Sequence, residues 1–375
     1  MNPAPDPAQV ANLVTALAFF LGMAFGSVAQ ATRFCTMGAI TDVMTYGNTD
    51  RLRALLMAIA TAIVVTQFLI AFEVLDLSSS IYTVPRLLWA SCLFGGLVFG
   101  GGMVLASGCT SKALIRAGSG NLKAVAVLLI AGFVGQMTLR GLLAGPRVNL
   151  LDALSMPLSV HQDLPSWIGS FIAISPRTIR MILGASIPAA LLLWIARDRS
   201  FVRSRDFLGA IVIGLVVCGG WYVTARIGFI AEHPDNLEPA WVATNSHRPE
   251  SLSFIAPLAF GMELLSLWSD ANTRLTFGVA AAIGVLVGAF LSAWRRHDLR
   301  WETFPSVEDT ANHFVGAAMM GFGGVTALGC TIGEGISGLS TLAANSMLAV
   351  AGIVAGAVLA VRYQMWRLDR EIESP

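Results

Sequence analysis

Charged residues are scarce in this chain of 375 residues. Asp, Glu, Lys and Arg together make up 13% of it, about half of their usual share in soluble domains. Hydrophobic residues make up 55%, and the mean hydropathy is +0.70. A soluble globule needs more polar surface than this composition supplies, and a disordered chain is far less hydrophobic. The composition therefore predicts an all-α polytopic protein of the lipid bilayer.

A strongly basic surface, a disulfide framework and a signal peptide are also missing. The 24 Lys and Arg residues nearly balance the 23 Asp and Glu residues, so the basic footprint of a nucleic-acid-binding protein is absent. Five cysteines are too few and too scattered for a secreted disulfide scaffold. The start, Met1–Asn2–Pro3, has no basic region, so residues 7–32 are expected to remain as a membrane span.

Stretches without any charged residue indicate the number of membrane crossings. A crossing takes about 20 mostly apolar residues, and flanking Arg or Lys side chains extend slightly shorter segments to the interface. Nine stretches qualify or nearly qualify: 7–32, 54–72, 87–111, 124–139, 181–196, 207–225, 275–294, 314–333 and 335–361. Two shorter apolar segments, Leu164–Pro176 and Ser251–Met262, are expected to be re-entrant or interfacial.

Basic residues gather on one side of this nine-span arrangement. Sixteen of the 24 Lys and Arg residues fall in alternate loops or in the C-terminal tail, within 33–53, 112–123, 197–205, 295–300 and 362–370. Basic loops remain on the cytoplasmic side of a membrane. The C-terminus is therefore expected in the cytoplasm and the N-terminus on the other side.

An internal repeat carries two of the five cysteines. The segments GGLVFGGGMVLASGCT and GAAMMGFGGVTALGCT begin at Gly95 and Gly316 and share six glycine, cysteine and threonine positions, at a constant separation of 221 residues. The copies end the third and the eighth expected spans, which run in opposite directions. The chain is therefore expected to form one membrane domain of two inverted halves, 1–178 and 179–375. A weaker echo ends at Cys35, nine residues after Gly26.

The cysteine motifs are expected to lie at helix breaks. Gly108 and Gly329 are expected to end helices in the left-handed conformation that glycine tolerates. Small polar residues follow each cysteine, namely Thr110, Thr331, Gly333 and Ser337. Irregular polar backbone occurs at membrane depth only where protein buries it or a watery cavity borders it. Cys35, Cys109 and Cys330 are therefore expected to face a solute pathway.

Other polar and sulfur-containing residues have simpler interpretations. Cys92 and Cys218 have apolar neighbours and are expected to be small buried side chains. Three thiols can hold a soft metal, but the chain has no Cys-x-x-Cys and its histidines, His233 among them, lie mostly in loops, so neither a metal nor a cofactor is expected. Glu250–Ser251 begins a short apolar segment whose first N–H groups could contact an anion. The roles of Lys112, Arg140 and Glu334 stay open.

Three motifs resemble those of a known family. The segments GGLVFGGGMVLASGCTSKALIRAGSG, GFGGVTALGCTIGEGISGLSTLA and RFCTMGAITD look like the YeeE/YedE family of sulphur transport membrane proteins, and the resemblance covers nearly the whole chain. It implies an hourglass-like fold of spanning and shorter helices in the bacterial inner membrane, which makes the outer side the periplasm. It also implies import of thiosulfate through a relay of three thiols, which correspond to Cys35, Cys109 and Cys330. A small cytoplasmic sulfur carrier of the TusA type is implied as a partner.

Two alternatives to thiosulfate import stay open. Some members of the family are linked to selenium metabolism, so the solute could be another sulfur or selenium compound. A membrane sulfurtransferase or redox protein could use the same thiols, but the chain has no cofactor motif and no resolving cysteine pair. Thiosulfate is a dianion with a soft terminal sulfur, to which a neutral thiol can donate a weak hydrogen bond. A transporter, and not an enzyme, is the favoured interpretation.

Overall fold

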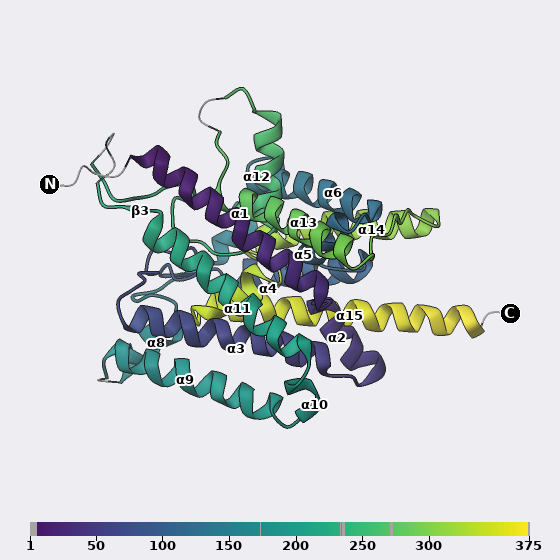
Figure 1. The fold of residues 1–375 in the computed structure, drawn as a ribbon, viewed down its shortest axis with the longest axis horizontal. Helices are drawn as coiled ribbons and strands as arrows, with labels where there is room; N and C mark the ends of the chain where they lie inside the picture. The colour runs from purple at the N-terminus through teal and green to yellow at the C-terminus, as the bar shows by residue number, and fades with distance from the viewer. Residues whose placement is uncertain (1–5, 173, 233, 235–236, 271–272, 374–375) are drawn as a thin grey trace.

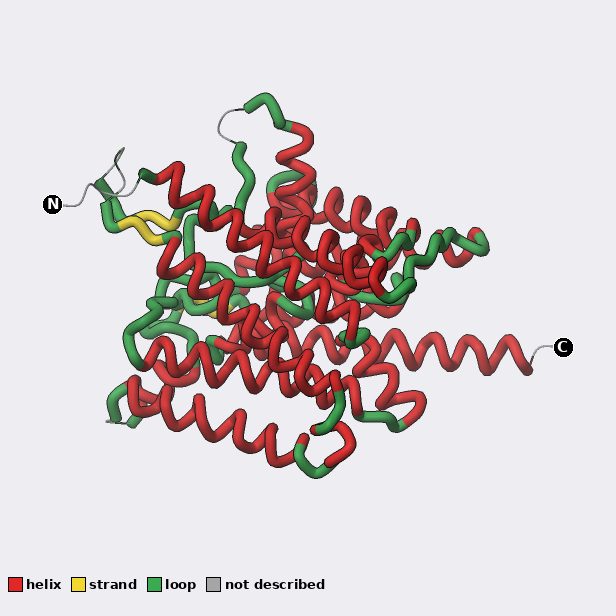
Figure 2. Tube along the Cα trace, viewed as in Figure 1, coloured by secondary structure: helices red, strands yellow, loops and turns green. Residues whose placement is uncertain are grey.

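Helices make up most of the protein, which is a computed structural model describing residues 6–172, 174–232, 234, 237–270 and 273–373 (Figure 2). Within these residues, sheet is limited to two antiparallel pairs of two-residue strands. One pair joins β1 (Arg86–Leu87) to β2 (Met156–Pro157), and the other joins β3 (Phe229–Ile230) to β4 (Ala240–Trp241). Met1–Asn2–Pro3 and His233, considered above, lie outside the described residues.

Nine long helices form the body of the part of the chain that the structure describes. They are α1 (Pro7–Ala31), α3 (Asp50–Ala71), α4 (Trp89–Leu105), α6 (Leu122–Leu139), α9 (Pro176–Ile195), α11 (Arg205–Tyr222), α13 (Phe277–Arg295), α14 (Val307–Thr326) and α15 (Ala344–Glu373). Short helices connect them: α2 (Thr36–Tyr46), α5 (Thr110–Gly118), α7 (Ala144–Pro146), α8 (Leu164–Phe171), α10 (Arg199–Val202) and α12 (Ile255–Ser266). The π-helical turns are η1 (Arg147–Leu151), η3 (Val223–Ile227) and η4 (Gly333–Gly338), and η2 (Asp152–Leu154) is a 3-10 turn.

Eight helical segments of the described chain are long and apolar enough to cross a membrane, so this is an all-α polytopic membrane protein as predicted. The stretch 314–333, expected to span, corresponds to α14, which is not among the eight and carries Glu308 and Asp309 in its first turn. Helix α14 nevertheless packs against both α4 and α6. In Figure 1 the start of α1 and the end of α15 lie at opposite ends of the longest axis.

The long helices begin and end close to the predicted boundaries, except for α14 and α15. Helix α14, at Val307–Thr326, begins and ends seven residues before the stretch 314–333 that predicts it. The stretch 335–361 was expected to span, but α15 begins only at Ala344, because the residues before it form η4 and a short irregular segment. Both short apolar segments contain a short helix, α8 in the first and α12 in the second. The sequence did not predict α2 and α5 as separate helices, although each begins directly after a cysteine.

The repeated glycines place α4 directly against α14. A Cβ atom on Gly102 would lie 2.6 Å from the backbone oxygen of Gly316, and a Cβ atom on Gly316 would lie 2.6 Å from that of Gly102. Gly95 and Gly323 approach each other in the same reciprocal way, at 2.8 and 2.6 Å. No side chain fits between backbones this close, so only glycine permits the crossing.

Enlarging a glycine at this crossing is expected to destabilise the protein. Gly102→Ala would push Cβ into the backbone of α14, at a cost of about 1–3 kcal/mol, and the melting temperature of the purified protein in detergent should fall by several degrees. Gly261→Ala is the matched control, since its Cβ would meet only Val279 at an ordinary 3.9 Å. Equal melting temperatures for the two variants would contradict the account of this crossing.

Candidate functional site

Three helix breaks share one backbone conformation, and each leads into one of the three cysteines predicted to face a pathway. The residue two positions before the cysteine is left-handed in every case: Arg33 has φ 52°, Ser107 has φ 55° and Leu328 has φ 67°. At the first two breaks, the next N–H bonds back to the carbonyl five residues earlier, from Phe34 to Ala29 and from Gly108 to Met103. This is the Schellman type of helix ending, here closed by residues that are not glycine.

The expectation that Gly108 and Gly329 themselves take the left-handed conformation is wrong. Gly108 has φ 159°, close to extended backbone, and Gly329 is not among the described residues with positive φ. A side chain at either glycine would come too close to a neighbouring side chain. A Cβ on Gly108 would lie 2.7 Å from Cδ of Lys112, and a Cβ on Gly329 would lie 3.1 Å from Oε1 of Glu334.

Each of the three cysteines stands at the start of the next helical segment. Cys35 caps α2, and the N–H of Gly38 donates to its Sγ at 3.1 Å. Cys330 precedes η4, and the N–H of Gly333 donates to its Sγ at 3.5 Å. Cys109 caps α5, and its Sγ lies 3.0 Å from the hydroxyl of Ser111. The first N–H groups of a helix have no partner within it and attract negative charge, so each sulfur lies where an anion is favoured.

A threonine follows each of these cysteines, and none of the three hydroxyls has a hydrogen-bond partner in the protein. Thr36, Thr110 and Thr331 are 8%, 0% and 2% exposed, and the Oγ1 atom of each is buried. A buried hydroxyl without a partner costs about 1–3 kcal/mol. The same unpartnered group at three related breaks provides donors for a polar ligand. The sequence pointed to Thr110 and Thr331, and it missed Thr36.

The loop before α12 adds a fourth polar contact to this region. Ser253 lies against η4, because a Cβ on Gly333 would be 2.5 Å from its Oγ, and this buried oxygen has no partner in the protein. The hydroxyl of Ser251 instead donates to the carbonyl of Val217 at 2.7 Å. Of the two serines, Ser253 therefore has the available donor, although the sequence pointed to Ser251. The spacing Ser-x-Ser was the one signal for it.

Glu250 lies in the loop before α12, outside the spanning helices. Its carboxylate accepts from the hydroxyl of Ser246 at 3.2 Å, and its N–H donates to Thr224 at 3.2 Å. Burial raises the pKa of Glu250 to about 7, while the bond from Ser246 opposes this rise. Near neutral pH the carboxyl is therefore partly uncharged, which lowers its repulsion of an anion.

Side chains of two long helices hold the segment after η4 in place. Gln67 of α3 donates to the carbonyl of Ser340 at 2.8 Å, and Trp221 of α11 donates to the Ser340 hydroxyl at 3.0 Å. The hydroxyl of Ser337, within η4, donates to the carbonyl of Leu252 at 2.7 Å. These bonds satisfy irregular backbone inside the helical bundle, as a membrane interior requires.

Basic residues lie beside the break at Cys109. The stem of Lys112 packs on Gly108, and a small recess next to Gly108 is lined by Arg116, Lys123 and His313. Arg116 forms an ion pair with Glu302 at 3.3 Å, and Lys123 forms one with Asp309 at 2.9 Å. Lys112, Arg116 and Lys123 therefore all lie near Gly108, at the turn between α4 and α5.

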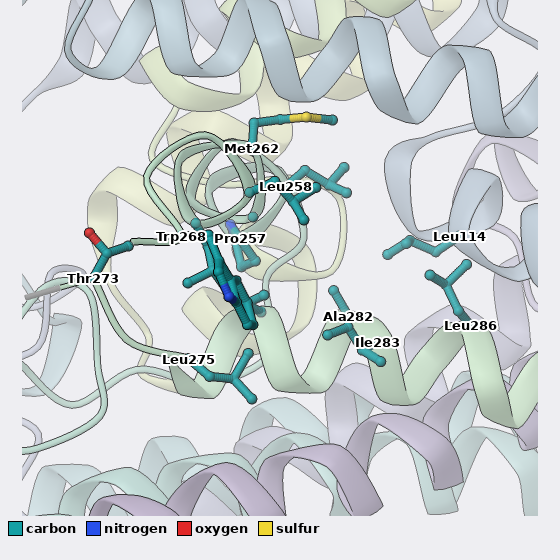
Figure 3. Close-up of a pocket in the computed structure, with 14 residues that line it drawn as sticks. Leu114, Pro257, Leu258, Met262, Trp268, Thr273, Leu275, Ala282, Ile283 and Leu286 are labelled. Carbon is teal, nitrogen blue, oxygen red and sulfur yellow. The ribbon is translucent and has the colours of Figure 1, made fainter. Parts of the chain in front are cut away.

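An apolar crevice of about 480 Å³ lies elsewhere, between α12 and α13 (Figure 3). Side chains of the two helices face each other across it, with Leu114 and Leu286 at the end opposite Trp268. Its lining contains no charged residue and none of the cysteines. An oxyanion needs hydrogen-bond donors, so this crevice does not suit one.

The remaining predicted residues have structural partners. Cys92 and Cys218 are buried among packed helices, as predicted, and the Cys218 thiol lies 3.5 Å from the hydroxyl of Thr66. Arg140 forms an ion pair with Glu263, and its guanidinium lies 5.5 Å from the ring centre of Phe260. In the described part of the chain, no group of three or more His, Cys, Asp and Glu side chains is placed to hold a metal.

Comparison with known proteins shows the family to which the chain belongs. The chain belongs to the sulphur transport family, whose model matches residues 31–359. It is 23% identical over 337 residues to the thiosulfate transporter TsuA of Escherichia coli, covering 84% of each chain. It is 24% identical over 345 residues to TsuA of Spirochaeta thermophila, covering 88% of this chain and 92% of that one. The probable transporter YedE of E. coli is 29% identical over 108 residues, 28% of this chain and 25% of that one.

The two serines before α12 are expected to respond differently to removal of the hydroxyl. Ser251→Ala leaves the carbonyl of Val217 without its partner and should cost about 1–3 kcal/mol of stability. Ser253→Ala removes a hydroxyl that has no partner, so the melting temperature should hold while transport falls. Thermal unfolding in detergent and solute uptake by cells separate the two. Loss of stability only in the Ser253 variant would contradict the assignment.

Proposed function

We propose that this protein imports thiosulfate across the bacterial inner membrane through the three buried helix breaks. The observation that carries the proposal is the repeated group of a buried thiol at the start of a helical segment and a threonine hydroxyl without a partner among the described residues, at Cys35, Cys109 and Cys330. Membership of the sulphur transport family and the similarity to two thiosulfate transporters support the choice of solute. Another sulfur or selenium oxyanion is the alternative.

The two ends of thiosulfate suit the two kinds of group at each break. Its sulfonate oxygens accept hydrogen bonds from the threonine hydroxyl and from the N–H groups at the helix start. Its terminal sulfur is soft, and a neutral thiol can donate a weak hydrogen bond to it. A thiolate would repel the dianion, so the thiols act in their protonated form. Several weak sites in series allow both binding and release, as conduction requires.

Cations at one end of the proposed pathway favour movement of the anion toward that end. The cations around Lys112 and Arg116 lie beside the Cys109 break, where they attract an anion toward the side of the basic loops. That side is the cytoplasm if basic loops stay inside. A small sulfur carrier of the TusA type is the proposed acceptor there. The protein acts as a transporter, and no step breaks a bond of the solute.

The same proposal assigns the chain an inverted repeat, with halves at 1–178 and 179–375. The contacts Gly102–Gly316 and Gly95–Gly323 support it, because a two-fold axis between α4 and α14 that relates Gly95 to Gly316 and Gly102 to Gly323 exchanges one contact for the other. Inverted repeats place a solute site near the middle of the membrane.

The proposed orientation has a direct test. A fluorescent protein that matures only in the cytoplasm should fluoresce when fused to the C-terminus, since the loops rich in Arg and Lys should remain inside. An alkaline phosphatase fusion at the same position, which is active only in the periplasm, should be inactive. The reverse pattern, with equal amounts of protein, would contradict the orientation.

Substitution of the cysteines tests the proposed pathway. In cells that lack their own importer, Cys109→Ala and Cys330→Ala should lower radiolabelled thiosulfate uptake by a factor on the order of ten or more, as loss of about 1.4 kcal/mol does. Cys35→Ala should lower it less. Serine keeps a small donor but lacks the soft sulfur, so Cys109→Ser and Cys330→Ser should fail nearly as badly as alanine.

Cys92→Ala and Cys218→Ala are the matched controls, since both remove a buried thiol that lies outside the three breaks. Each should keep nearly normal uptake at equal membrane abundance. Excess sulfate should compete poorly with thiosulfate in the wild type. Equal loss in all five cysteine variants, or full uptake by both serine variants, would remove the thiol pathway.

A further inference from the structure

A buried acid, Glu334, lies beside the third cysteine, Cys330, and the proposed pathway gives this acid no role. Glu334 is 0% exposed and is part of η4, where its N–H donates to the carbonyl of Cys330 at 2.8 Å. Its two carboxylate oxygens point to the two ends of this segment. One would lie 3.1 Å from a Cβ on Gly329, and the other 3.1 Å from a Cβ on Gly338. The carboxylate is therefore enclosed by the break that holds Cys330.

No counter-charge compensates this carboxylate. Both oxygens are buried without a hydrogen bond of good geometry, and none of the ion pairs between described residues includes Glu334. The break at Cys109 differs, because there Ala113 stands at the position related to Glu334, and Lys112 packs beside the break. A buried carboxylate without a partner is strongly unfavourable when charged, so such a group takes up a proton.

The groups that face Glu334 are neutral or acidic. Cys330 lies on its own segment, Tyr82 approaches from the loop after α3, and Cys92 approaches from α4. The polar residues on the adjoining parts of the packed helices are Gln67 on α3, Cys218 on α11, and Asn345 and Ser346 on α15. Glu250, in the loop before α12, adds a second acid near Tyr82. None of these groups can hold a positive charge against the carboxylate.

We propose that Glu334 is a proton-binding site coupled to the anion, so that each thiosulfate passing Cys330 requires the Glu334 carboxyl to be protonated. This inference rests on the proposed function and adds a coupling ion to it. The proton comes from water when the dianion binds and returns to water when the dianion leaves, and no covalent bond to the solute changes.

Coupling of this kind works in both directions. A bound dianion beside Glu334 favours the neutral carboxyl, and the neutral carboxyl in turn favours the dianion by the same factor. As pH rises and Glu334 loses its proton, affinity for thiosulfate should fall by up to about tenfold per pH unit. Lower pH should favour binding.

The test measures KM for radiolabelled thiosulfate in cells or vesicles between about pH 6 and pH 8.5, where a group with the ordinary pKa of Glu would not titrate. The wild type should show a KM that rises with pH. Glu334→Gln keeps the shape of the neutral acid, so it should transport with a KM that no longer depends on pH. Glu250→Gln should keep a rising KM, as should Glu73→Gln, whose parent side chain is 83% exposed.

The outcomes separate the inference from the proposed function. A pH-independent KM in the wild type, or a KM that rises as steeply with pH in Glu334→Gln as in the wild type, would overturn the role of Glu334 alone. Absence of thiosulfate uptake at every pH would overturn the proposed function and the inference with it. If Glu334→Gln does not transport, purified wild-type protein in weakly buffered detergent, at a pH in the range where its KM rises, should still take up protons when it binds thiosulfate, approaching one per anion. Binding without proton uptake would overturn the inference.

Discussion

A helix that breaks inside a membrane protein leaves backbone groups that water cannot satisfy. Here three such breaks occur, before Cys35, Cys109 and Cys330, and much of the molecule compensates for them. At each break, the chain around the left-handed residue forms hydrogen bonds back to the preceding helix. Gln67 and Trp221 bond to the chain beyond η4 from two long helices. Among the described residues, the threonine hydroxyls stay unpaired, and hydroxyls at helix starts are donors that can bind an oxyanion.

The close crossing of α4 and α14 makes the buried breaks possible. Both helices lead directly into a break, and their glycines let the backbones meet without intervening side chains. The two breaks therefore lie on helices held in one rigid contact. Their charges differ, however, because Lys112 lies beside the Cys109 break and Glu334 beside the Cys330 break. In the proposed pathway, a dianion moving between them meets a cation at one break and an acid at the other, and the proton on that acid is proposed to control binding at Cys330.

Much of this arrangement is predictable from sequence, because it depends on spacing. The charge-free stretches predict the long helices other than α14 and α15 to within several residues, and the repeated Gly-Cys-Thr located two breaks. Other features depend on three-dimensional packing. At the two repeated breaks the left-handed residues are Ser107 and Leu328, which carry no sequence signal for that conformation, whereas the glycines expected to adopt it, Gly108 and Gly329, lie one position later. The segment that follows Glu334, as far as Ala343, was expected to begin a membrane span. Composition does not distinguish a π-helical turn such as η4 from a regular helix. The free hydroxyl of Ser253 became apparent only from its contact with Gly333.

The central claim is that a sulfur oxyanion binds at the buried breaks, with its soft end toward a thiol. Selenosulfate carries selenium in place of the soft terminal sulfur, and the anomalous scattering of selenium locates that atom directly. In crystals of the protein grown with selenosulfate, the account predicts anomalous peaks in van der Waals contact with Sγ of Cys109 or Cys330. The oxygens should point to the starts of α5 or η4 and to Thr110 or Thr331. Selenium found only in the apolar crevice between α12 and α13, or at the surface, would contradict the account.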